Sequence, residues 1–99
     1  MLEKYIVALV GATRNLTGLD PQWEDYLIAG ASPRASIALL RAASATAYIR
    51  GRDHVIPEDI IEIAADVIRH RLILGYAARA ANVSRDDIIQ RILEHTPIP

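Results

Sequence analysis

The strongest constraint on the fold is one long run without glycine or proline, Ala35 to Arg50, with helix-ending signals on both sides. Before it, Ser32 is a favoured N-cap residue and Pro33 suits the first position of a helix. After it, Gly51 readily adopts the left-handed conformation in which helices commonly end. The sequence therefore predicts a long helix that must pack against other elements. Its expected buried face contains Ile37, Leu40, Ala43, Ala47 and Tyr48.

Apolar residues also recur at helical spacing near the N-terminus, where residues 2–14 are predicted to form an amphipathic helix within a first segment, 1–14. Residues 15–31 are rich in turn formers, and we expect a loop there with a short helix, Trp23–Ala29, that Gly30 ends. The apolar positions of the first helix are Leu2, Tyr5, Ile6, Leu9, Val10 and Thr13.

Two further helices are predicted in the second half of the chain. Pro57–Asp59 opens the first with acidic residues where the helix dipole favours them, although Ile56 stands where Ser or Thr would cap better. Ser84 with Asp87 resembles a capping box that starts the second helix. The expected buried positions are Ile60, Ala64, Val67, Ile68 and Leu72 on the first, and Ile88, Ile89, Ile92 and Leu93 on the second.

These segments predict a single all-α domain over residues 1–99, a small bundle of four or five helices. Residues 32–95 form most of the bundle, and 96–99 form an extended tail. Residues 73–83 fit helix, loop and short strand equally, so their conformation stays open. A chain of 99 residues is long enough for one modest core.

Composition argues against several classes of function. Without cysteine there is no disulfide framework and no thiolate metal site. No apolar run approaches the length of a membrane span, and no signal peptide is apparent, so we expect a cytoplasmic protein without membrane contact. A net charge of −1 argues against dedicated nucleic-acid binding. His54 with Glu58, and Asp66 with His70, form no recognisable ligand set, so no metal site is predicted.

The start of the long helix is the leading candidate site. Unpaired backbone N–H groups and partial positive charge suit an anion there. Arg34 alone in this place is mildly disfavoured, by roughly 0.3–1 kcal/mol, unless a phosphate joins it, because guanidinium pairs with phosphate oxygens in a directed way. The alternative on spacing alone is a solvated arginine that follows a Ser32–Pro33 helix start.

Arg69, His70 and Arg71 form the second candidate site. At a helix end, cations are stabilised by the dipole and the last carbonyls, so a structural role is sufficient. Asp66 lies one turn before His70 and is positioned to pair with it. The alternative role is an interface with nucleotide or with a neighbouring subunit.

The stretch Gly30–Ala43 resembles the segment that carries the second sensor motif in the lid of MoxR-type AAA+ ATPases. Similar spacing continues through Gly51–Ile60, and Arg69–Leu74 is similar to another sequence pattern of that family. Thr13–Arg14 and the closing Pro97–Pro99 fit as well. The resemblance therefore covers nearly the whole chain and implies a helical bundle of the AAA+ lid type.

The resemblance implies that Arg34 reaches the terminal phosphate of ATP, bound with magnesium in a core domain N-terminal to this lid. It also implies neighbouring subunits of a ring as partners, a chaperone-like remodelling role, and association with von Willebrand factor A-domain proteins. The chain has no G-x-x-x-x-G-K-S/T loop, so we expect no hydrolysis by this part alone. One charge-assisted contact contributes about 1.5–3 kcal/mol, which predicts negligible ATP affinity for the lid by itself.

A histone-like interaction module is the alternative. A long central helix, a short turn and then Ile56–Ile60 is a pattern that also occurs in histone folds, which dimerise and bind DNA. The near-zero net charge weighs against DNA.

Overall fold

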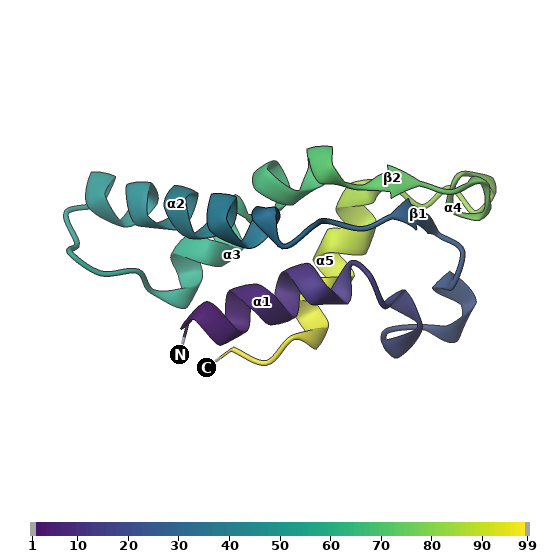
Figure 1. Ribbon diagram of the computed structural model, residues 1–99, viewed down its shortest axis with the longest axis horizontal. Helices are drawn as coiled ribbons and strands as arrows, with labels where there is room; N and C mark the ends of the chain where they lie inside the picture. The colour runs from purple at the N-terminus through teal and green to yellow at the C-terminus, as the bar shows by residue number, and fades with distance from the viewer. Residues whose placement is uncertain (1, 99) are drawn as a thin grey trace.

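The computed structural model describes residues 2–98 and confirms a mostly helical domain. It measures 43 × 22 × 20 Å, with the turn between α2 and α3 at one end and β1, β2 and α4 at the other (Figure 1). Met1 and Pro99, at the ends of the predicted first segment and tail, lie outside the described residues. In chain order the elements are α1 (Leu2–Ala12), two 3-10 turns (Leu16–Gly18 and Pro21–Trp23), β1 (Leu27–Ala29), α2 (Arg34–Ile49), α3 (Pro57–Ile68), a 3-10 turn (Arg69–Arg71), β2 (Ile73–Leu74), α4 (Tyr76–Ala80) and α5 (Arg85–His95).

Local signals set the end of α2 and the start of α5 where the sequence predicts them, whereas the first helix, predicted over residues 2–14, ends at Ala12. Gly51 has a φ of 78°, and its N–H donates to the Tyr48 carbonyl at 3.0 Å while the Arg52 N–H donates to the Ala47 carbonyl at 2.9 Å. This is the Schellman pattern, and it ends α2 because glycine adopts positive φ without a Cβ clash. At α5 the predicted capping box is confirmed, since Ser84 and Asp87 exchange hydrogen bonds of 3.1 and 2.9 Å.

The N-cap residue of α3, Ile56, has an apolar side chain, and the buried carboxylate of Asp59 makes the side-chain hydrogen bond at this helix start. Asp59 Oδ2 accepts the Ile56 N–H at 3.0 Å, and Asp59 Oδ1 accepts a hydrogen bond from the Arg52 guanidinium. Asp59 is fully buried. Burial raises its pKa, but the Ile56 N–H and the Arg52 charge outweigh this, so the pKa lies below its ordinary value of 3.8. The charged form therefore joins the Gly51–His54 turn to α3.

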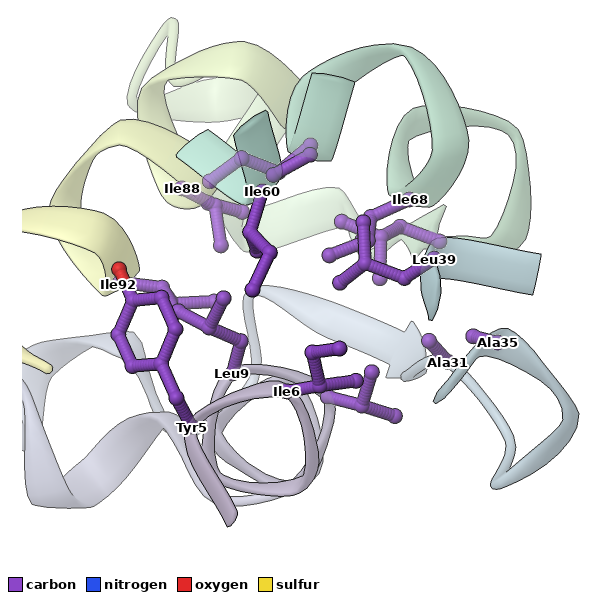
Figure 2. Packing of buried hydrophobic residues seen from close by; sticks show 14 of the residues in the cluster. Tyr5, Ile6, Leu9, Ala31, Ala35, Leu39, Ile60, Ile68, Ile88 and Ile92 are labelled. Carbon is purple, nitrogen blue, oxygen red and sulfur yellow. The ribbon is translucent and has the colours of Figure 1, made fainter. Parts of the chain in front are cut away.

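The hydrophobic core lies where α1, α2, α3 and α5 meet, and Figure 2 shows its largest side chains converging from these helices. The faces predicted for α1, α3 and α5 are confirmed, with Leu2, Val67 and Leu93 only partly buried against the cluster. The cluster contains Tyr5, Ile6, Leu9, Val10, Leu16, Ala31, Ala35, Leu39, Ala43, Ile60, Ala64, Ile68, Leu72, Ile88, Ile89 and Ile92.

The predicted buried face of α2 is wrong at three of its five positions. Ile37, Leu40 and Tyr48 are exposed, with 57%, 39% and 82% of their surface accessible. Ala43 and Ala47 are buried as predicted, and Ala35 and Leu39 complete a buried stripe with one residue every four positions. Alanine at three of the four positions lets α2 lie close to α3, and this close contact excludes the larger side chains from the interface.

The predicted short helix at Trp23–Ala29 is also wrong. Pro21–Trp23 forms a 3-10 turn, capped by Asp20, and Leu27–Ala29 is the strand β1. It pairs antiparallel with β2, with Leu27 opposite Leu74. Within the undecided segment 73–83, the structure places β2 and then the short helix α4. The pairing of β1 with β2 determines the extended conformation of both strands, because so short a strand has little conformational preference of its own.

The corrected face of α2 predicts opposite outcomes for two adjacent leucines. Leu39→Ala removes a fully buried side chain and should lower the free energy of unfolding by about 2–5 kcal/mol. Leu40→Ala is the matched control and should cost less than about 1 kcal/mol, because Leu40 already contacts solvent. Urea unfolding followed by circular dichroism measures both. Equal losses would contradict the observed packing of α2.

The buried carboxylate of Asp59 predicts a specific loss of stability in acid. A carboxyl whose pKa is lowered on folding stabilises the folded state above its unfolded pKa, near 3.8, and this contribution is lost as the pH falls through the lower folded value. Asp59→Asn should therefore be less stable than the natural chain at pH 7, and the difference should shrink below pH 3.8. Urea unfolding from pH 7 to 2.5 measures the two curves. A constant difference over this range would contradict the assignment.

Candidate functional site

The first candidate site is the start of α2, where the chain turns from an extended segment into the helix. The helix begins at Arg34, with Pro33 as its N-cap at φ −56° and ψ −23°. The Ser32 carbonyl accepts the Ala35 N–H at 2.9 Å. The predicted side-chain cap is not formed, because the exposed Ser32 hydroxyl makes no hydrogen bond within residues 2–98.

The Arg34 side chain is exposed and has no hydrogen bond or ion pair with any of the residues 2–98. The first turn of α2 contains no acidic residue. The partial positive charge of the helix start and the guanidinium charge therefore lie together without a nearby counter-charge on α2. This arrangement suits an anion with several oxygens, because the guanidinium can donate to it and the partial positive charge of the helix start attracts it.

The second candidate site separates into a paired arginine and two unpaired residues. Arg69 donates from Nε to Asp86 Oδ1 at 2.6 Å and from a terminal nitrogen to Asp86 Oδ2 at 3.2 Å. It also donates to Asp66 at 3.2 Å, so Asp66 pairs with Arg69 and not with His70 as predicted. The hydrogen bond to Asp86 raises the pKa of Arg69 most, against a smaller opposing effect of burial. Arg69 thus ties the end of α3 to the start of α5.

His70 and Arg71 remain exposed and make no hydrogen bond or ion pair within the described part of the chain. A pocket of about 260 Å³ lies beside His70, lined by Arg69, His70, Leu72 and Arg85. Arg85 Nε donates to the Leu72 carbonyl at 2.9 Å, which holds this arginine at the pocket wall. The pocket therefore has basic side chains from two elements in its wall, of which Arg69 already pairs with Asp66 and Asp86.

Sequence reasoning missed one polar residue near the first site. It assigned Thr13 to the apolar face of α1, and the structure shows it buried with its hydroxyl bonded to the Ala31 N–H at 2.8 Å. A buried threonine at the end of an amphipathic helix was the available signal, because a buried hydroxyl needs a partner. Among residues 2–98, no group of three or more metal-ligating side chains is present, and no helix is long and apolar enough to cross a membrane.

Comparison with known proteins identifies the family. Residues 24–92 match the AAA lid domain family. Over 99 residues the chain is 43% identical to the protein named Chaperone MoxR1 of Mycobacterium tuberculosis, covering 99% of this chain and 26% of that protein. The chain belongs to the AAA lid domains of the MoxR family.

Other relatives agree with this assignment. A crystal structure from Cytophaga hutchinsonii, provisionally named an ATPase, superimposes with a TM-score of 0.90 and 46% identity over 99% of this lid and 30% of that chain. Protein MoxR of Methylorubrum extorquens is 40% identical over 72 residues, which cover 71% of this lid and 21% of that protein. The lid thus spans about a quarter to a third of the length of these proteins. The family assignment replaces the histone-like alternative.

The two arginines of the second site should respond differently to removal. Arg69→Ala breaks the connection between α3 and α5 and should lower the unfolding temperature of the lid by on the order of a few degrees. Asp86→Asn should have a similar effect. Arg71→Ala is the control and should leave the unfolding temperature unchanged, because Arg71 is exposed and unpaired within residues 2–98. Thermal unfolding at low and high salt measures this; equal effects of the two arginines would contradict the structural role of Arg69.

Proposed function

We propose that this chain is the nucleotide-sensing lid of a MoxR-type AAA+ ATPase, and that Arg34 contacts the terminal phosphate of ATP bound by the core domain of the intact protein. The observation that carries the proposal is an exposed, unpaired guanidinium at a helix start without acidic neighbours in its first turn. Membership of the AAA lid family supports it, because this stretch of the sequence resembles the second sensor motif of that family.

In this function the core domain holds ATP and magnesium, and Arg34 adds positive charge where negative charge develops during phosphoryl transfer. The lid has neither a phosphate-binding loop nor a magnesium-binding acidic pair of its own. A single charge-assisted contact is too weak to hold ATP. The position of the lid therefore responds to nucleotide only when the core supplies the other contacts.

The second site fits a protein interface. His70 and Arg71 are exposed, His70 lines the pocket, and Arg69 holds that segment in place through Asp86. We assign this surface to a neighbouring subunit in a ring, where acidic groups of the neighbour pair with Arg71. Ring assembly is the organisation that AAA+ membership implies.

For the intact protein, we infer a cytoplasmic, chaperone-like remodelling ATPase without nucleic-acid or membrane binding. One relative is itself named a chaperone, which supports this class of activity. A von Willebrand factor A-domain protein is the expected partner on the basis of the family resemblance. These assignments concern the whole protein, of which this lid is one part.

The sensor role predicts that Arg34→Ala lowers ATP turnover of the full-length ATPase by on the order of 100-fold. Arg34→Lys should recover only part of it, because lysine keeps the charge but loses the planar, bidentate donor. Steady-state hydrolysis at saturating ATP measures the effect, and thermal unfolding should show almost no change, since Arg34 is exposed.

Arg41 provides a matched control on the same helix. It is exposed and has no partner within residues 2–98, so Arg41→Ala removes the same charge at a different position on α2. Its turnover should stay within twofold of the natural enzyme. Equal effects of the two substitutions, or a loss of folding that parallels the loss of turnover, would overturn the sensor assignment.

A further inference from the structure

The Thr13 hydroxyl joins the end of α1 to the segment that leads into α2. Its Oγ1 donates to the Val10 carbonyl at 2.6 Å and accepts the Ala31 N–H at 2.8 Å. Thr13 is buried, with 2% of its surface exposed. Both the donor and an acceptor position of the hydroxyl are therefore used, and the second bond connects residues that lie 18 apart in the sequence.

The two backbones also touch directly at Gly30. A Cβ atom on Gly30 would lie 2.5 Å from the Thr13 carbonyl oxygen, a distance that real side chains do not allow. Ala31 and Ala35 are fully buried beside this contact, and Figure 2 shows them next to each other at the edge of the core. Only small residues fit this junction, so its geometry is closely defined.

The start of α2 has few other polar connections. Its N-cap makes no side-chain hydrogen bond, and the Arg34 side chain has no partner within residues 2–98. The direction in which Arg34 leaves the domain therefore depends on the packing of α2 and on the backbone that precedes the helix. The hydrogen bond from Ala31 lies three residues before Arg34 and connects a side chain to this backbone.

We infer that Thr13 is a positioning residue for the nucleotide sensor: its hydroxyl sets the start of α2 so that Arg34 meets the phosphate. This inference rests on the proposed function of Arg34. A buried hydrogen bond at the base of a helix controls the path of its first turn, and a misplacement of about 1 Å at a charged contact can cost about 100-fold in rate. Thr13 acts through Arg34 and does not itself touch the nucleotide.

Thr13→Val in the full-length ATPase tests this directly. Valine has nearly the same shape as threonine but leaves the Ala31 N–H without its acceptor. We expect kcat for ATP hydrolysis to fall by about 10-fold to 100-fold. Thr13→Ser retains the hydroxyl and should restore most of the turnover, which a role in apolar packing alone would not predict.

A double-mutant cycle separates positioning from a general structural effect. If Thr13 acts through Arg34, then adding Thr13→Val to Arg34→Ala should cause no further loss of kcat. If the loss from Thr13→Val is the same size in both backgrounds, the inference is overturned. If Arg34→Ala alone leaves kcat unchanged, the proposed sensor function itself fails, so the two failures are distinguishable.

Thr46→Val is the matched control. The Thr46 hydroxyl donates to the Ala42 carbonyl at 3.0 Å within α2 and connects no second segment. Its kcat should match that of the natural enzyme. Should Thr13→Val fail to fold, Thr13→Cys provides a milder change, because a thiol is a weak donor and acceptor. Its kcat should be intermediate and should show the same dependence on Arg34; independence from Arg34 would overturn the inference.

Discussion

The rest of the structure depends on the close approach of α2 to the core. Ala35, Ala43 and Ala47 place only a methyl group each between this helix and its neighbours, and Leu39 fills the remaining space. Small side chains at four-residue spacing form a shallow stripe into which the Ile60, Ala64 and Ile68 side of α3 can pack. The position of α2 then fixes where Arg34 leaves the domain.

The same packing leaves large apolar side chains on the outer side of α2. Ile37 and Leu40 line an apolar groove of about 150 Å³ together with Ile6 and Val7 of α1. Ile37 lies one turn after Arg34, so the first turns of α2 carry both an unpaired cation and an apolar surface. This combination is typical of a surface that meets another part of a larger protein, and the lid is about a quarter of the length of its curated relatives.

Features that depend on neighbouring residues could be predicted from the sequence, and those that depend on distant residues could not. The end of α2 at Gly51 and the start of α5 at Ser84 follow from local hydrogen bonds, and both were predicted. The pairing of β1 with β2 and the ion pair of Arg69 with Asp86 join segments far apart in the sequence. The buried face of α2 was misassigned at Ile37, Leu40 and Tyr48 because hydrophobic spacing favours large side chains for the core, whereas the packing of α2 buries mainly alanine.

The two candidate arginines show why an arginine must be placed in space before a role is assigned. Arg69 has two carboxylates as partners, and these bonds account for its presence without a ligand. Arg34 lies where the helix dipole opposes its charge, at a cost of roughly 0.3–1 kcal/mol, and no carboxylate within residues 2–98 offsets it. An anion bound at the same helix start would offset this cost, because it interacts favourably with both the helix dipole and the guanidinium. Arg34 therefore has a charge that no side chain of residues 2–98 offsets, whereas the charge of Arg69 is already offset by Asp66 and Asp86.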